Sequence, residues 1–80
     1  MHELAIVEDL MNTVVQSAQE HKLQRVKSIK IVVGKKTAAL PDSLMFCFEA
    51  LSPETILAGA SLEIEETPGR ELYVEYYDAE

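Results

Sequence analysis

The sequence predicts a small α+β domain in which two amphipathic helices pack on a three-stranded sheet, in the order helix, strand, helix, strand, strand. Three observations support this fold class. The chain has 80 residues, enough for one small domain and too few for two. In two segments, apolar residues recur every three or four positions, as on one face of a helix. In three others, they alternate with polar residues, as in half-buried strands.

The first helix is expected from Leu4 to about His21. The apolar residues at helical spacing are Leu4, Val7, Leu10, Met11, Val14, Val15 and Ala18. Glu8 and Asp9 lie in the early turns, where negative charge suits the helix dipole, and His21 lies near the end, where positive charge does. We interpret His21 as a surface residue, with metal contact as the alternative. His2 is left just outside the start of the helix.

The segment RVKSIKIVVG, residues 25–34, predicts the first strand. Ile29, Ile31 and Val33 share one parity, the segment is rich in β-branched residues, and Gly34 ends it.

A loop then leads into a second helix, which begins near Pro41 because proline is tolerated in a first helical turn. Its apolar residues at helical spacing are Leu44, Cys47, Phe48 and Leu51. Pro53 ends this helix near Leu51.

Two alternating segments, SLEIEE and ELYVEYY, predict the last two strands. Between them, in residues 67–70, Pro68 and Gly69 suit the two central positions of a type II turn. We therefore expect these two strands to pair as a hairpin.

Alternation along the last strand places Leu72, Val74 and Tyr76 on one face and Tyr73 and Tyr77 on the other. Two aromatic residues among carboxylates could mark a protein contact. An amphipathic edge strand produces the same pattern.

The charge balance argues against two classes of partner. Seven Lys and Arg against fourteen Asp and Glu leave a net charge of -7, which repels nucleic acid phosphates and anionic membranes. The basic residues cluster between Lys22 and Lys36. They predict a locally positive edge, which could meet an acidic protein partner or be simply solvated.

Cys47 is the only cysteine, so an internal disulfide and a Cys-rich zinc site within one chain are excluded. Between Phe46 and Phe48, it is expected to be a buried small hydrophobic residue. There is no secretory leader and no apolar run of membrane-spanning length, so a cytoplasmic protein is expected. No reactive Ser or Cys is paired with a His, and no glycine-rich phosphate loop is present, so an enzyme is not expected.

The opening residues MHE suggest metal chemistry. The amine of Met1, the backbone nitrogen of His2 and the Nδ1 atom of its ring can close fused five- and six-membered chelate rings around one ion. The backbone nitrogen of Glu3, or an oxygen from a neighbouring loop, would complete a square-planar set that suits Ni(II) or Cu(II) better than Zn(II). Alternatively, His2 is an ordinary exposed residue ahead of a helix.

Five segments, in order, resemble one known family: MHE, RVKSIKIVVG, FCFEAL, TILAGASLEIEETPG and GRELYVEYYDAE. Together they cover most of the chain. The chain resembles the HypA/HybF family of nickel metallochaperones in hydrogenase maturation.

The resemblance implies that residues 1–80 form the nickel-binding domain of this family. Its Ni(II) site would use the Met1 amine, the backbone and ring of His2, and the backbone of Glu3. The implied partners are the nickel-handling GTPase of the pathway and the precursor of the [NiFe]-hydrogenase large subunit. A homodimer is left open.

Two departures from the family pattern stand out. Members carry a zinc-binding module with two CxxC pairs between the last two strands, whereas here residues 67–70 join them directly, so no zinc is expected. Leu40 stands where relatives often have an acidic residue that could bind the metal. Asp42 is the nearest substitute, either as a metal ligand or as a residue that hydrogen-bonds the free N–H groups of the second helix.

Two functions therefore remain. The first is a nickel chaperone domain that works through its free N-terminus and a protein partner. The second is a metal-independent interaction module that kept the fold after losing the zinc module.

Overall fold

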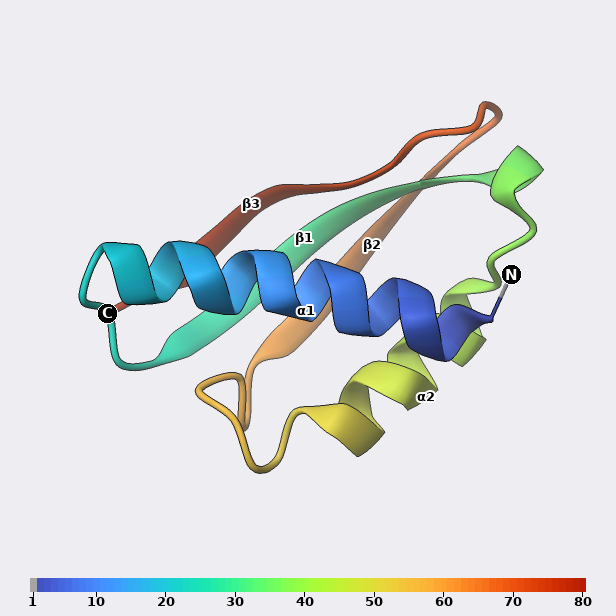
Figure 1. The fold of residues 1–80 in the computed structure, drawn as a ribbon. Helices are drawn as coiled ribbons and strands as arrows, with labels where there is room; N and C mark the ends of the chain where they lie inside the picture. The colour runs from blue at the N-terminus through green and yellow to red at the C-terminus, as the bar shows by residue number, and fades with distance from the viewer. Residues whose placement is uncertain (1) are drawn as a thin grey trace.

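The structure is a computed structural model of the chain and describes residues 2–80. Its elements are α1 (Glu3–Glu20), β1 (Val26–Gly34), the short 3₁₀ helix η1 (Lys35–Thr37), α2 (Pro41–Leu51), β2 (Ser61–Thr67) and β3 (Leu72–Ala79). The two α-helices lie on one face of the three-stranded sheet (Figure 1). The predicted fold class is confirmed. No helix within residues 2–80 is both long and apolar enough to cross a membrane.

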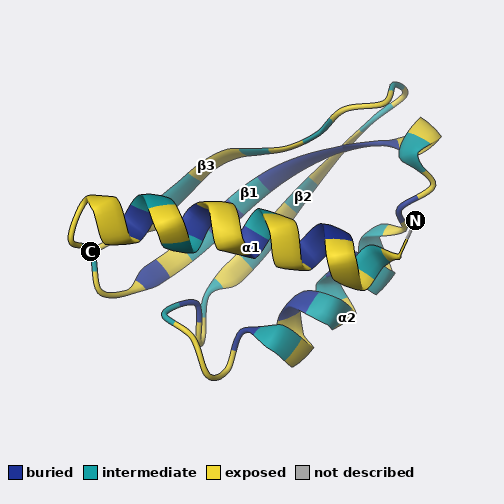
Figure 2. Cartoon of the chain, in the orientation of Figure 1, coloured by how far each residue is buried: buried dark blue, intermediate teal, exposed yellow. Residues whose placement is uncertain are grey.

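The core lies between the helix layer and the sheet (Figure 2). Its most deeply buried side chains are Ile31, Leu44, Leu57, Val14, Val26 and Val33. The buried stripe of α1 differs from the predicted one at its first turn, because Ile6 is buried whereas Leu4 is 46% exposed. The helix is rotated so that Ile6 and Val7 together face the sheet layer.

The strand order is β2-β1-β3, so the predicted hairpin is wrong. β1 pairs with β2 in parallel and with β3 in antiparallel orientation. A parallel pair needs a long crossover, and the segment that contains α2 provides it between β1 and β2. β1 is the most buried strand and takes the centre, where both its edges are hydrogen-bonded.

The connection from β2 to β3 crosses over the end of β1 (Figure 1). The two outer strands are about 10 Å apart, a distance that four residues can span. The Gly34 amide donates to the Glu71 carbonyl at 2.6 Å, and the Lys36 amide donates to the Gly69 carbonyl at 2.9 Å. A Cβ atom at Gly34 would overlap this carbonyl, so glycine is needed there. Gly69 lacks the positive φ that the predicted type II turn requires.

A β-bulge changes the two faces of β3. Lys30 opposes Tyr76 and Ile31 opposes Val74, so Glu75 is an extra residue between them. Tyr76 is therefore exposed, and Tyr77 packs against the core, where its hydroxyl lies 2.6 Å from the Ser17 hydroxyl. The predicted faces are wrong for both tyrosines, because one extra residue reverses the alternation from that point on.

The crossing predicts an unequal response of two glycines. Gly34→Ala is expected to lower the free energy of unfolding by about 1–3 kcal/mol, because the new Cβ pushes the crossing segment away from β1. Gly69→Ala is the matched control, since its Cβ would meet only the flexible Glu71 side chain, and a change below about 0.5 kcal/mol is expected. Urea unfolding followed by circular dichroism measures both. Equal losses would contradict this role of Gly34.

Candidate metal centre

Of the three predicted N-terminal ligands, Met1 lies outside the described residues, and His2 is the first that the structure describes. His2 occupies the N-cap position of α1 with extended backbone angles (φ -86°, ψ 128°), and its side chain makes no capping hydrogen bond. The residue is exposed. Its ring is therefore free to approach an ion in solvent.

The backbone around His2 is also available. The Ile6 amide donates to the His2 carbonyl at 3.2 Å, which is the first turn of the helical ladder. The backbone N–H groups of the residues before Ile6 have no acceptor within the helix, as at the start of every α-helix. The Glu3 amide is one of them, and the half-buried Glu3 side chain places a carboxylate at the positive end of the helix dipole.

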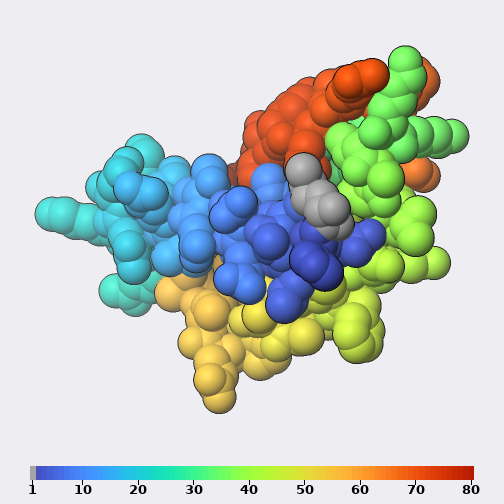
Figure 3. Space-filling view, turned by 45° about the vertical axis from the view of Figure 1, so that its right-hand side comes forward, coloured from blue at the N-terminus to red at the C-terminus, as the bar shows by residue number. Residues whose placement is uncertain are grey.

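A shallow hollow of about 450 Å³ adjoins these residues. The residues that line it are His2, Glu3, Leu4, Asp42, Ser43, Phe46 and Cys47. They come from the starts of α1 and α2, which lie side by side (Figure 3). Two turns of helix, far apart in sequence, thus meet at the predicted metal-binding end.

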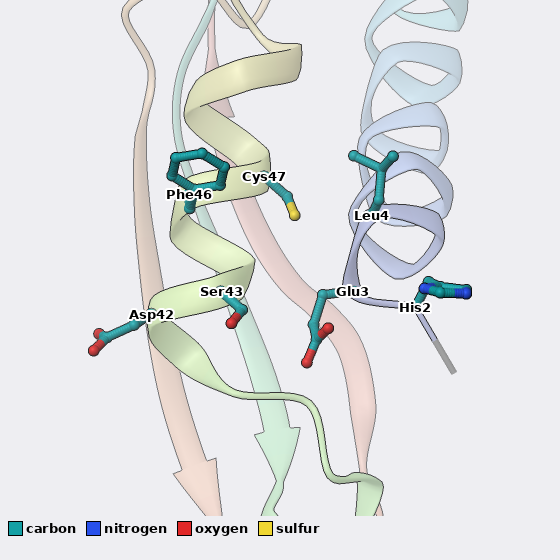
Figure 4. A pocket seen from close by; sticks show the side chains of 7 residues that line it. All are labelled: His2, Glu3, Leu4, Asp42, Ser43, Phe46 and Cys47. Atoms are coloured by element: carbon teal, nitrogen blue, oxygen red, sulfur yellow. The ribbon is translucent and has the colours of Figure 1, made fainter.

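The side chains around the hollow do not converge on one point (Figure 4). The Glu3 carboxylate and the Ser43 side chain lie in the space between the helices, whereas the His2 ring points away from α2. The Asp42 carboxylate points to the far side of α2. Asp42 is thus close to the predicted site in the fold, but this orientation does not bring its carboxylate to His2.

Asp42 does not cap its helix either. The N-cap residue of α2 is Leu40, and no side-chain capping bond is formed there within the described chain. Asp42 follows Pro41 in the first turn, where its charge still favours the helix dipole. The predicted hydrogen bond to the free N–H groups is wrong, because the extended N-cap position falls on Leu40 instead.

Cys47 was predicted to be a buried small hydrophobic residue, and it is half-buried and packs against the core. Its sulfur points from α2 toward α1 at the inner end of the hollow (Figure 4). Phe48 faces the core, whereas Phe46 is 73% exposed. The three successive residues thus lie on three sides of the helix.

The second histidine is remote from this end. His21 is the C-cap residue of α1, is exposed, and places its Nδ1 atom 2.8 Å from the Ser17 carbonyl oxygen. The 18 residues of α1 separate it from His2 by about 27 Å. One ion cannot bind both rings of the same chain, and the interpretation of His21 as surface structure agrees with its position.

The donor atoms at this end suit a square-planar ion better than an ion surrounded by a cluster of side-chain ligands. Within residues 2–80, no group of three or more His, Cys, Asp or Glu side chains is arranged to hold a metal. What this end does present is an exposed imidazole and free backbone amides. These are nitrogen donors of the kind that suits Ni(II) or Cu(II).

The basic residues do not form one positive edge, contrary to prediction. Lys22 and Arg25 lie in the turn and loop between α1 and β1. Lys35 and Lys36 lie in η1, at the other end of a strand about 30 Å long. Lys30, midway between, is paired with three glutamates. Extension of the strand separates charges that are neighbours in sequence.

By its fold, the chain is a small α+β domain with a histidine ahead of its first helix. A family model described as "Hydrogenase/urease nickel incorporation, metallochaperone, hypA" matches residues 1–72. The chain belongs to this HypA family, as the sequence motifs indicated. The match starts at Met1 and includes all four predicted metal ligands.

Curated relatives carry the name hydrogenase maturation factor HypA. The relative from Dehalococcoides mccartyi is 43% identical over 70 residues, which are 88% of this chain and 59% of the relative. A relative from Nostoc sp. is 44% identical over 69 residues, which are 86% of this chain and 58% of the relative. The chain therefore spans about three fifths of the length of the curated relatives it matches.

A solved structure has the same fold. The solution structure of the Ni metallochaperone HypA from Helicobacter pylori superposes with a TM-score of 0.74, covering 95% of this chain and 72% of that one. At 15% sequence identity, this likeness concerns the fold alone.

The orientation of α2 predicts different roles for its two phenylalanines. Phe48→Ala is expected to lower the free energy of unfolding by about 3–5 kcal/mol, because it leaves a cavity in the core. Phe46→Ala, the matched control at the rim of the hollow, is expected to change it by less than about 0.5 kcal/mol. Thermal or urea unfolding distinguishes them. A large loss from the Phe46 variant would mean that this rim is covered in solution.

Proposed function

We propose that this chain binds Ni(II) at its N-terminus and transfers it to protein partners in the maturation of a [NiFe]-hydrogenase. The observation that carries the proposal is the position of His2, exposed and extended directly ahead of a helix whose first amides are free. Membership of a nickel metallochaperone family supports nickel as the cargo.

The proposed ligands are nitrogen atoms of three successive residues. The Met1 amine, the His2 backbone nitrogen and the His2 Nδ1 atom form the fused chelate, and the Glu3 backbone nitrogen is the fourth donor. This set requires that the chain start at Met1 with an unblocked amine. Retention of Met1 is expected, because histidine is too large a second residue for efficient removal of the initiator methionine.

Selectivity does not follow from this donor set. Intrinsic affinity for such a site is higher for copper than for nickel, so the supply of the metal and the protein partners must select the ion. Delivery would proceed by ligand exchange with the nickel-handling GTPase and then with the hydrogenase large-subunit precursor. In this role the chain is a carrier and makes or breaks no bond in a substrate.

We further propose that residues 1–80 act as the nickel-binding domain without the zinc module. The four-residue crossing from β2 to β3 and the single cysteine of the chain support this. Residues 67–70, where the module would be inserted, lie at the same end of β1 as η1. Any contribution of zinc to nickel binding would then be dispensable for this chain.

A Ni(II) titration of the untagged chain tests the site. At about pH 7.5, near the pKa of an α-amine, we expect one-to-one binding with the visible absorption of a square-planar complex. His2→Ala and an N-terminal extension should each abolish it. His21→Ala is the matched control and should bind as the parent does, because its ring lies at the far end of α1.

Two results would decide between the alternatives. Unchanged binding in the His2 variant would refute the proposed site. Absence of nickel binding in the parent, with a mass spectrum that confirms a free Met1, would favour the metal-independent interaction module. Asp42→Asn tests the remaining ligand, and equal affinity in this variant would exclude its carboxylate.

The same titration should depend steeply on pH. Binding displaces protons from the amine, whose pKa is about 7.7–8.0 in unfolded peptides, and from at least one backbone amide. Affinity is therefore lost as pH falls, and we expect binding at pH 6 to be at least about a hundredfold weaker than at pH 7.5. Competition with a metal indicator measures this. A flat profile would contradict backbone-nitrogen ligation.

A further inference from the structure

The face of the sheet opposite the helices is not covered by any other element of residues 2–80 (Figures 1 and 2). Tyr73 and Tyr76 are 48% and 52% exposed there. Beneath them, Val32 is only 3% exposed, although no helix packs on it. Val32 lies between Glu65 of β2 and Tyr73 of β3, its partners on the two neighbouring strands. We call this surface the open face, and its outward residues include Lys30, Glu63, Glu65, Tyr73, Glu75 and Tyr76.

The bulge in β3 builds this surface. Strict alternation from Val74 would turn Tyr76 toward the helices, but the extra residue Glu75 turns it outward. Tyr73 and Tyr76 thus become successive outward positions of one strand, opposite Val32 and Lys30. Two exposed aromatic rings, with a carboxylate between them, result from a local distortion of the strand.

The charges of the open face are held in place. The Lys30 ammonium lies 3.0 Å from Glu65, 3.2 Å from Glu75 and 3.7 Å from Glu63. Its nitrogen is also 5.9 Å from the centre of the Tyr76 ring. Hydrogen bonds to Glu65 and Glu75 raise the pKa of Lys30 above its ordinary value, so it remains charged at neutral pH. One cation thus orders three carboxylates and leaves two net negative charges.

Ordered carboxylates beside exposed tyrosines favour a particular ligand chemistry. A guanidinium group stacks on aromatic rings and binds a carboxylate through two parallel hydrogen bonds. Tyrosine is enriched at the centres of protein interfaces, and side chains that are already ordered lose less entropy on binding.

Electrostatics also distinguishes between the possible partners of the open face. A second copy placed face to face would oppose glutamates to glutamates, and each chain carries a net charge of -7. A basic partner would instead be attracted by the net negative charge that the three glutamates leave around Lys30. Charge complementarity therefore favours a different, basic protein over a second copy of this chain.

We propose that the open face is a docking surface for a protein segment that presents arginine side chains. Tyr73 and Tyr76 oppose Val32 and Lys30, which are alternate positions of β1 about 7 Å apart, the same spacing as arginines at alternate positions of an extended segment. His2 lies at the start of α1, in the helix layer on the other side of the sheet (Figure 1). Docking here would leave the N-terminus accessible, and the proposal does not depend on nickel binding.

The test uses a defined probe, the peptide Gly-Arg-Gly-Arg-Gly-Arg-Gly, with its lysine and glutamate counterparts. The full chain, labelled with ¹⁵N, is titrated at low ionic strength and followed by amide chemical shifts. We expect shifts concentrated on the open face, tighter binding of the arginine peptide than of the lysine peptide, and no binding of the glutamate peptide. Nickel-site variants such as His2→Ala should bind the peptide unchanged.

Variants locate the contact. Tyr73→Ala and Tyr76→Ala should each weaken binding of the arginine peptide by about fivefold, as expected for loss of a cation–π contact. Tyr76→Phe keeps the ring and should bind as the parent does, which guards against a loss caused by misfolding. Glu65→Gln should also weaken binding, whereas Glu8→Gln and Glu49→Gln, exposed helix carboxylates with the same charge change, should have less than a twofold effect.

Three outcomes would overturn the proposal. Shifts spread over the helix carboxylates, or equal losses in the Glu65 and Glu8 variants, would indicate non-specific attraction to an acidic protein. Equal affinity for the arginine and lysine peptides would exclude a guanidinium site. Sedimentation that shows a dimer of the chain, lost in the Tyr76→Ala variant, would assign this face to self-association.

Discussion

The burial of β1 is the constraint on which the rest of the structure depends. This strand is buried at six of its nine positions, more than either neighbour, and it needs hydrogen-bonding partners along both edges. β2 and β3 supply them, and the helices cover one of its faces. The connection between β2 and β3 must then cross the end of β1, which only a glycine at position 34 permits. The same crossing brings η1 and the β2–β3 connection together by a backbone hydrogen bond.

The N-terminal end owes its properties to the way α1 is anchored. Ile6 and Val7 pack into the core just after the exposed Leu4 and anchor the start of the helix, so His2 ahead of it is held at a defined place without being buried itself. His2 remains extended and exposed, and the free amides of the first turn are a consequence of helix geometry. A helix with an open start would suit the proposed carrier role, in which the ion must be both held and released.

The bulge at Glu75 decides which tyrosine faces each side of the sheet. It turns Tyr77 toward Ser17 in the helix layer and Tyr76 toward solvent. Lys30 then orders the glutamates of both neighbouring strands from the central one. The proposed metal chemistry and the proposed docking chemistry thus lie on opposite sides of one small sheet, and neither competes with the other for residues.

The sequence by itself determined what depends on local pattern. This includes the helices and strands, their order along the chain, the fold class, the motifs of the family and the position of His2 ahead of a helix. Periodicity and turn residues act over a few positions, so they can be read without the fold. Tertiary structure alone decided the order of the strands within the sheet, since β2 pairs with β1, the most apolar strand, and not with β3, which follows it after four residues. It also decided the burial of Ile6 instead of Leu4, and the direction of Asp42, which depends on how α2 packs beside α1. The outward position of Tyr76 could not be predicted from the sequence either. The extra residue Glu75 reverses the alternation of the strand, and the pattern of apolar residues does not indicate where such a residue lies.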